Sequence, residues 1–464
     1  MKIKIKERNP VTSQIITDDP TVIPYLRKVL GYNYTWYEQG PFSKEKKTQF
    51  YPVVSAKGIF LSGFIDRVAF LLIDKYEFVP ELDCPDYGIE PDWPPYLVGI
   101  TLREDQEKAV NEMTEEGGYS RGVWQAPTGS GKTVLIGALC SCFSTPTLII
   151  VHTSSLFEQT YEELKKFFPD EEDEIGRFGC GYKEVKEITI GMIQTLAKVD
   201  VGMFFKDYGM IIVDEAHHVN NLSGTYANVL KRLFAPVRFG FTATLPNDQR
   251  GQMALEGLIG PTIGRTTYTE MEKREILAKP KLKFYAVPES DTLKDELKGT
   301  YDKVYQKGIV ENRTRNKLIL DKAAEQLNEG KTVLIMVERV EHGEILREMS
   351  KLLSSTNVEF VFLHGDTDKE IVEEQKRRFE NGETKAVIAT RIWSEGVNIR
   401  SVGCVVNAVG GESEIAVIQR FGRGLRKAEG KEDVILIDFI DQNHKWFIKH
   451  SLKRVVTYSE WGWL

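Results

Sequence analysis

One short segment combines glycines, a lysine and a hydroxylated residue in an order suited to binding phosphate. The segment reads Ala-Pro-Thr-Gly-Ser-Gly-Lys-Thr, with alanine where the general pattern begins with glycine. The runs before and after it predict a strand and a helix, so loop N–H groups and the helix N-terminus would face one anion. In this pattern the lysine reaches the β- and γ-phosphates of a nucleotide, and the final hydroxyl binds Mg²⁺. The candidate residues are Ala126, Pro127, Thr128, Gly129, Ser130, Gly131, Lys132 and Thr133.

Two adjacent carboxylates follow the apolar run at 210–213. They are Asp214 and Glu215, and unpaired carboxylates at the end of a buried strand are costly. Beside a phosphate-binding loop, Asp214 fits a Mg²⁺ ligand acting through water. Glu215 fits the group that orients and deprotonates the attacking water. Taken alone, the same dipeptide could instead cap a helix.

Two further segments could complete such a site. The sequence Thr-Ala-Thr at 242–244 ends another apolar run, and its hydroxyls could bond to His217 or Asp214. A later stretch carries three arginines, whose planar guanidinium groups suit phosphate and could close on the γ-phosphate. The alternative for this stretch is a solvated basic surface. Its candidate residues are Gln419, which could also contact His217, and Arg420, Arg423 and Arg426.

The pattern of apolar and polar residues after residue 97 predicts the helices and strands that must position these residues. Short apolar runs alternate with helical stretches, and runs this apolar are typical of strands covered on both faces. We expect an α/β fold with two tandem parallel-sheet lobes, at 97–280 and 316–464, joined by a polar connection at 281–315. The expected strands are 147–151, 188–193, 210–214, 239–244, 332–337, 359–364, 385–390, 404–409 and 434–439.

Residues 1–95 are expected to form a separate small α+β domain. The run at 1–7 alternates polar and apolar residues like a strand, and 51–55 predicts another. Helices are expected at 21–30 and within 60–75. The stretch at 83–96 is rich in Pro, Gly and Asp, so it predicts a domain boundary.

Composition narrows the class of protein. The chain has 464 residues, 41% of them hydrophobic, and 61 basic against 68 acidic side chains give a net charge of −7. This charge excludes a polycation that coats nucleic acid, although a local basic groove stays open. Five scattered cysteines predict neither a disulfide framework nor a structural metal site. No apolar run reaches about 18 residues, and the first ten residues lack the apolar region of a signal peptide, so we expect a cytoplasmic protein with no membrane partner. We also expect a monomer.

Four motifs, A-x-x-G-x-G-K-T, D-E-A-H, T-A-T and Q-R-x-G-R-x-x-R, stand in an order that resembles the superfamily 2 helicases and translocases. The resemblance implies two RecA-like lobes that use ATP and Mg²⁺. It also implies that Arg103 and Gln106 recognise adenine. Further segments resemble motifs that contact nucleic acid, where Trp393 could stack on a base or lie in the core. The candidates are Thr153, Gly176, Gln194, Thr195, Arg339, His364, Gly365, Thr390, Arg391 and Trp393.

Within that superfamily the chain is most similar to the phage UvsW and T5-type branch-migration helicases, and more distantly to XPB and RecG. This resemblance implies action on single-stranded, forked and branched DNA, with residues 1–95 as a possible junction-binding domain. Three alternatives stay open. They are an RNA helicase, the motor subunit of a restriction-type system, and a non-catalytic nucleic-acid scaffold. The scaffold predicts loss of Lys132, Glu215 or Arg423, and all three are present.

Overall fold

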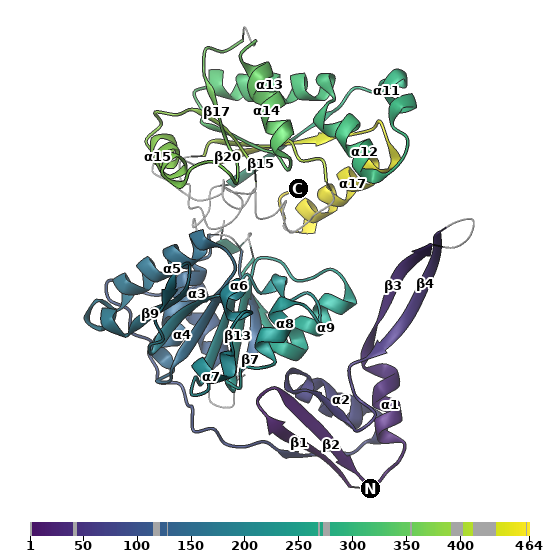
Figure 1. Ribbon diagram of the computed structural model, residues 1–464, viewed down its shortest axis with the longest axis vertical. Coiled ribbons are helices and arrows are strands. Elements are labelled where there is room, and N and C mark those ends of the chain that lie inside the picture. The colour runs from purple at the N-terminus through teal and green to yellow at the C-terminus, as the bar shows by residue number, and fades with distance from the viewer. Residues whose placement is uncertain are drawn as a thin grey trace. The chain divides into compact units, whose positions relative to one another are not determined.

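The chain forms two compact units. The first comprises Met1–Ala126 and Gly131–Thr266, and the second comprises Pro127–Ser130 and Thr267–Leu464. The computed structural model (Figure 1) describes residues 2–39, 44–114, 121–127, 129–267, 270–271, 279–352, 355–390, 402–411, 433–460 and 462–464.

The first unit contains an eight-stranded sheet in the order β10-β9-β11-β8-β12-β13-β7-β14. All neighbouring strands are parallel except β10 and β9. Every residue of β8, β12 and β13 is buried, which confirms the expected two-sided cover. The strands are β7 (Arg121–Gln125), β8 (Thr147–Val151), β9 (Ile175–Gly179), β10 (Tyr182–Lys183), β11 (Ile188–Met192), β12 (Met210–Asp214), β13 (Val237–Thr242) and β14 (Thr262–Arg265).

Helices enclose this sheet within two hydrophobic clusters. One cluster contains Trp124, Leu139 and Phe157, and the other contains Phe205 and Leu230. No described helix of the chain is long and apolar enough to cross a membrane. The helices are α3 (Glu104–Thr114), α4 (Lys132–Cys142), α5 (Ser154–Phe167), α6 (Ile193–Leu196), α7 (Val201–Phe204), α8 (Thr225–Leu230) and α9 (Gln249–Leu258), with short turns η2 (Pro169–Glu174) and η3 (Ala216–His218).

The second unit is built on a six-stranded parallel sheet in the order β15-β20-β19-β16-β18-β17. Its strands are β15 (Lys279–Ala286), β16 (Val333–Met336), β17 (Phe360–Leu363), β18 (Ala386–Ala389), β19 (Cys404–Asn407) and β20 (Asp433–Ile440). Its helices are α11 (Asp291–Glu296), α12 (Tyr301–Tyr305), η4 (Gln306–Val310), α13 (Arg313–Asn328), α14 (Val340–Ser350), α15 (Lys369–Glu380) and α17 (Lys445–Glu460).

The expected connection at 281–315 is instead part of the second unit. The β15 strand pairs with β20 along its whole length, and the helices that follow pack in the same unit. Lysines alternate with other residues at the start of β15, so this edge strand reads as a polar segment in the sequence.

Three side chains fix the segment 408–411, which follows β19. Arg315 donates to the carbonyl of Ala408 at 2.8 Å, and the Tyr305 hydroxyl donates to Val409 at 2.5 Å. Arg454 of α17 donates to the carbonyl of Gly411 at 3.1 Å. Because each donor lies on a different helix, the backbone after β19 is held from three sides.

Both arginines are buried with carboxylate partners. Arg454 lies 2.9 Å from Asp438, and each of these side chains is 1% exposed. Arg315 pairs with Asp441 at 2.8 Å. Burial lowers the pKa of Arg454, but the charge and hydrogen bonds of Asp438, together with Tyr458 and Asp441, raise it above its usual value. Arg454 therefore keeps its charge inside the unit.

The N-terminal module is a small α+β structure, as expected. Its sheet has the order β5-β2-β1-β6, and a separate two-stranded hairpin extends from it (Figure 1). The expected strand at 51–55 is confirmed only at Tyr51 and Pro52, which end the second strand of this hairpin, while residues 53–55 form no strand. The elements are β1 (Ile3–Asn9), β2 (Thr12–Thr17), α1 (Val22–Val29), β3 (Gly31–Gln39), β4 (Lys44–Pro52), β5 (Ile59–Leu61), η1 (Ser62–Phe64), α2 (Ile65–Tyr76) and β6 (Glu81–Asp83).

The N-terminal module packs directly on α9 and belongs to the same compact unit as the first lobe. A Cβ atom added to Gly63 would lie 1.9 Å from the carbonyl oxygen of Glu256, so only glycine permits this approach. Met253 of α9 shares the hydrophobic cluster of the module. Arg67 pairs with Glu256 at 2.7 Å. These contacts fix the module on the lobe.

We predict that Arg454→Met lowers the free energy of unfolding of the second unit by about 3–5 kcal/mol, because it leaves the Asp438 carboxylate buried without a cation. Urea unfolding followed by circular dichroism measures the change. The control is Arg347→Met, since Arg347 pairs with Glu348 on the surface and is 45% exposed. It should change the value by less than about 0.5 kcal/mol. Equal effects of the two variants would contradict the prediction.

Candidate active site and nucleic-acid interface

Polar residues gather at one edge of the first sheet, where its parallel strands end. Five strands follow one another directly in the sheet, in the order β7, β13, β12, β8 and β11. Ala126 follows β7, Thr242 ends β13, and Asp214 ends β12. His152 follows β8, and Gln194 lies just beyond β11. The sheet thus brings the predicted phosphate-binding residues beside one of the predicted nucleic-acid contacts.

The phosphate-binding loop is tied to the neighbouring strand. The N–H of Ala126 donates to the carbonyl of Thr242 at 2.7 Å. Gly129 and Gly131 have positive φ angles of 91° and 84°. A Cβ atom at Gly131 would lie 2.5 Å from Nε2 of Gln106. Glycine at this position therefore allows both the backbone turn into α4 and the close approach of the Gln106 amide.

The candidate adenine-recognition residues lie beside this loop. Arg103 bonds both carboxylate oxygens of Asp105, each at 3.0 Å. Its backbone N–H donates to Oε1 of Gln106 at 3.2 Å. Gln106 is buried next to Gly131, so its amide position is fixed before any nucleotide binds.

Lys132 and Glu215 form an ion pair with only 2.5 Å between Nζ and Oε1. Their side chains are 13% and 10% exposed. Burial raises the pKa of Glu215, but the charge of Lys132 and the hydrogen bond with His217 outweigh it, so this pKa lies well below the usual value. Glu215 also has a left-handed backbone, with φ and ψ both 51°. For a residue other than glycine this conformation costs about 1–2 kcal/mol, which is typical of functional positions.

Asp214 and Thr133 could together hold Mg²⁺. Asp214 is buried, and Oδ1 accepts the N–H of Glu215 at 2.9 Å. Burial raises the pKa of Asp214, and a bound cation would favour its ionised form. Thr133 lies in the first turn of α4, next to Lys132. Among the described residues, no group of three or more His, Cys, Asp or Glu could hold a metal ion. The oxygen donors fit a Mg²⁺ ion that takes its other ligands from nucleotide phosphates and water.

His217 connects the catalytic carboxylate to the end of β13. Its Nδ1 atom lies 3.0 Å from Oγ1 of Thr242 and 3.4 Å from Oε2 of Glu215. The Thr242 hydroxyl in turn donates to the carbonyl of Thr244 at 2.8 Å. The structure therefore brings His217 to the expected 242–244 segment. Its other expected partner, Gln419, lies outside the described residues.

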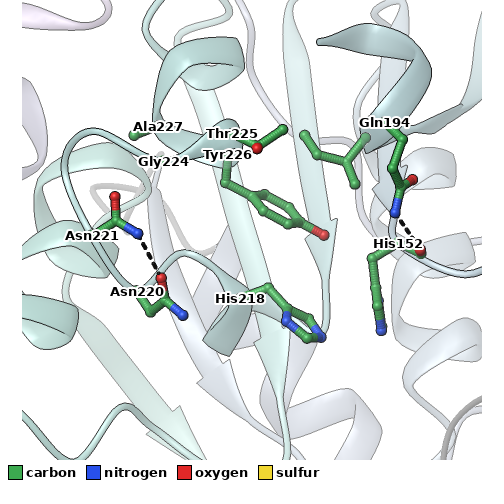
Figure 2. Close-up of a pocket in the computed structure, with 10 residues that line it drawn as sticks. His152, Gln194, His218, Asn220, Asn221, Gly224, Thr225, Tyr226 and Ala227 are labelled. Carbon is green, nitrogen blue, oxygen red and sulfur yellow. Dashed lines mark hydrogen bonds between the residues drawn. The ribbon is translucent and has the colours of Figure 1, made fainter.

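A cavity of about 420 Å³ lies further along the same edge (Figure 2). The Gln194 side chain donates to the carbonyl of His152 at 2.8 Å. The ring of His218 lies 4.0 Å from that of His152 and 6.2 Å from that of Tyr226. The stretch that begins at His152 resembles a motif that contacts nucleic acid, whereas Tyr226 was not among the sequence candidates.

Three further nucleic-acid candidates of the first unit are Thr153, Thr195 and Gly176. The Thr153 hydroxyl caps α5 by accepting the N–H of Leu156 at 3.2 Å. Thr195 lies in α6, next to Gln194. Gly176 is buried near the start of β9, and its contact with nucleic acid stays a prediction. A Cβ atom there would meet the carbonyl oxygen of Glu184 at 2.7 Å, so close packing explains this glycine.

The second sheet has a corresponding edge. Arg339 follows β16, His364 and Gly365 follow β17, and Thr390 follows β18. These three strands are neighbours in the order β16-β18-β17. The Arg339 side chain donates to Oε1 of Gln306 at 2.8 Å, which fixes its direction. The structure therefore brings four of the predicted nucleic-acid contacts to one edge of the second unit.

Seven of the candidates lie outside the described residues. They are Thr128, Arg391, Trp393, Gln419, Arg420, Arg423 and Arg426.

Two family matches cover the regions that carry these sites. Residues 99–247 match the family described as "Type III restriction enzyme, res subunit", and residues 315–428 match "Helicase conserved C-terminal domain". The chain belongs to the superfamily 2 helicases. Together, the two matched regions contain the four motifs on which the sequence resemblance rests.

Curated relatives extend this similarity over most of the chain. A Rad25 relative from Haloarcula marismortui is 28% identical over 78% of this chain, which spans 57% of that protein. The "DNA 3′-5′ translocase XPB2" of Sulfurisphaera tokodaii is 28% identical, with 79% of this chain and 88% of that protein covered. The "ATP-dependent DNA helicase uvsW" of Enterobacteria phage T4 is 24% identical, over 73% of this chain and 72% of that protein.

A solved structure supports the two-lobe fold. Dbp5 of S. cerevisiae, in a structure described as bound to RNA and ADP BeF3, matches with a TM-score of 0.53. Its sequence identity is 16%, and the match covers 84% of this chain and 90% of Dbp5. The chain therefore shares the arrangement of elements within two RecA-like lobes with that protein.

We predict that Lys132→Met abolishes ATP hydrolysis and lowers the free energy of unfolding by about 1–3 kcal/mol at pH 7.5, because Glu215 loses its cation. With its pKa below the usual 4.5, Glu215 stabilises the fold above that pH and loses this contribution as the pH falls through its folded pKa. Without Lys132, burial dominates and the folded pKa rises. The stability difference should therefore shrink below about pH 4.5.

Urea unfolding at pH 7.5 and below about pH 4.5 measures the stability difference, and an ATPase assay measures turnover. Lys206→Met is the control, because Lys206 is 71% exposed. Normal turnover by a folded Lys132→Met protein would contradict the assignment of the loop.

Proposed function

We propose that this chain is an ATP-dependent DNA helicase or translocase that unwinds or branch-migrates forked and recombination-intermediate DNA. One observation carries the proposal. A single edge of the first sheet holds the Lys132–Glu215 pair and, on the next strands, the cavity beside His152 and Gln194. A motor needs the two sites to be adjacent, because ATP binding and hydrolysis must change its affinity for nucleic acid.

In this proposal each residue of the nucleotide site has one task. Lys132 and the N-terminus of α4 bind the phosphates, while Thr133 and Asp214 hold the Mg²⁺ that balances their charge. Lys132 now pairs with Glu215, so binding of a phosphate to Lys132 weakens that pair. Glu215 is then free to orient the attacking water and accept its proton.

His217 supplies a route from hydrolysis to the rest of the lobe. It contacts both Glu215 and Thr242, and the loop after Thr242 leads into α9. On its other side, the His217 ring lies 4.3 Å from that of His218, which faces the cavity in Figure 2. A change in the charge on Glu215 therefore reaches residues of the nucleic-acid edge through two ring contacts.

The DNA preference rests on the relatives named for DNA translocation and unwinding. RNA is the main alternative substrate, and the similarity in fold to an RNA-bound protein favours it. A restriction-type motor is favoured by the family that matches residues 99–247. The N-terminal module is the proposed source of a preference for forks and junctions, because phosphate contacts alone carry no such preference.

Deletion of residues 1–95 is a poor test of that role. The module shares its hydrophobic cluster with Met253 and pairs with Glu256 of α9. Removing it would expose this apolar surface of the lobe. Point variants on the module separate nucleic-acid binding from folding.

We predict that Glu215→Gln retains ATP binding but hydrolyses ATP about 100-fold or more slowly, because an amide cannot accept the proton of water. Fluorescent-nucleotide binding and steady-state ATPase rates measure the two properties. Glu348→Gln is the control, since Glu348 is an exposed surface carboxylate. Loss of nucleotide binding by Glu215→Gln would contradict the division of tasks with Asp214.

We predict that single-stranded and forked DNA stimulate the ATPase, that RNA of matched sequence does not, and that a forked duplex is separated only with ATP. The polar strand-end residues hold a backbone without reading its bases, so DNA of any sequence should stimulate the ATPase. The preference for DNA over RNA rests on the relatives named for action on DNA. ATPase rates with each polymer at one salt concentration provide the measurement, with the Lys132→Met protein as the negative control. Stimulation by RNA alone would establish the RNA alternative.

A further inference from the structure

The hairpin of the N-terminal module presents an aromatic face. Its strands pair from Gly31 with Pro52 to Gln39 with Lys44, and neither strand joins another sheet. On one face Tyr32 stacks on Tyr51 with 5.7 Å between ring centroids. Tyr34 stacks on Trp36 at 6.1 Å on the same face. Tyr34 and Tyr51 remain 38% and 37% exposed. A two-stranded ribbon has no sheet of its own to bury these rings.

The base of this hairpin is fixed to the first lobe at the start of α9. The N–H of Asn33 donates to Oε1 of Gln249 at 3.3 Å. The guanidinium of Arg250 lies 5.0 Å from the ring centroid of Tyr34, within cation–π range. The neighbouring Asp248 carboxylate accepts the N–H of Gly251 at 2.9 Å as the cap of α9. A basic group and an aromatic ring therefore lie together where the hairpin meets the lobe.

A cavity of about 520 Å³ opens at this junction. The hairpin contributes Asn33, Tyr34 and Thr35, and α9 contributes Arg250 with its cap Asp248. Asn220 and Asn221 form the opposite wall.

The same two asparagines also line the cavity beside His152 and Gln194 (Figure 2). They follow His218 in the chain, and Asn221 donates to Asn220 at 2.8 Å. The two cavities therefore share one wall. A polar path runs from the strand-end edge of the lobe across Asn220–Asn221 to the aromatic face of the hairpin.

We propose that unpaired bases of a nucleic-acid strand stack on the aromatic face of the β3–β4 hairpin after the strand crosses Asn220 and Asn221. The inference rests on the proposed function and names the surface by which the N-terminal module contributes to it. Aromatic rings bind unpaired bases without sequence preference, and two asparagine amides offer both donors and acceptors. Arg250 holds a phosphate beside Tyr34.

The charges on the described part of the hairpin set a specific expectation. The sequence of β3 and β4 carries three lysines against two glutamates, a net charge of +1, and Lys47 pairs with Glu38. Stacking rather than neutralisation of phosphates therefore provides most of the affinity of the hairpin. Loss of its rings should weaken binding while leaving the dependence of affinity on salt nearly unchanged.

The test uses full-length Tyr34→Ala/Trp36→Ala protein. Fluorescence anisotropy with a labelled oligothymidylate at two salt concentrations should show about tenfold weaker binding or more, with an unchanged salt slope. The control is Phe70→Ala, because Phe70 lies on α2 of the same module and is 67% exposed. Tyr34→Phe retains a ring and should bind like the unaltered protein. Equal affinity of the double variant and the Phe70→Ala control would overturn the inference.

The basal ATPase rate should be the same in all four proteins, because these residues lie outside the nucleotide site. If the unaltered protein neither binds nucleic acid nor is stimulated by it, the proposed function fails. If it binds and the double variant binds equally well, only the role of the hairpin fails.

Photo-crosslinking of the unaltered protein gives an answer that does not depend on the folding of a variant. A bromodeoxyuridine oligonucleotide should crosslink within residues 31–52, as mapped by mass spectrometry of the peptides. Crosslinks confined to the two lobes would overturn the inference. A hairpin that serves a protein partner would give that result.

Discussion

The structure of the active site depends on one buried electrostatic contact, between Lys132 at the start of α4 and Glu215 after β12. Each charge alone would be costly at this depth in the lobe. Together they hold the phosphate-binding loop against the carboxylate strand. The same contact keeps Glu215 ionised and supports its left-handed backbone. Phosphate must compete for Lys132, so occupation of the loop and release of the carboxylate are linked by charge.

The parallel sheet places this contact in a row of site residues along one edge. Each β-strand contributes its last residue or the next few to the same edge, so strand order alone decides which sites are neighbours. In the first unit that order places the nucleotide residues on β7, β13 and β12 and the nucleic-acid candidates on β8 and β11. The second unit repeats the principle on β16, β18 and β17. No long-range contact is needed for the two groups of residues to influence one another within the first lobe.

The sequence was informative where burial and motif agree. Runs such as 147–151 and 210–214 are apolar throughout, and the structure confirms them as central strands. Prediction failed at β15 and at the β3–β4 hairpin, because edge and isolated strands carry lysines and polar residues. The pairing of Lys132 with Glu215 joins residues far apart in the chain, so only the fold could reveal it.

The contact of Gly63 with the backbone of α9 limits which domains can be exchanged between this protein and others. On the other side of the interface, a Cβ atom at Gly257 would lie 2.6 Å from the ring of Phe64, so both surfaces are shaped to each other. An N-terminal module taken from another protein would fit this lobe only if it brought a glycine to the same spot. The lobe would fit another module only if that module left room beside α9. In a chimera, the N-terminal module and the first lobe would therefore have to come from the same protein. Engineering that alters substrate choice has to keep the residues of this interface and change residues outside it.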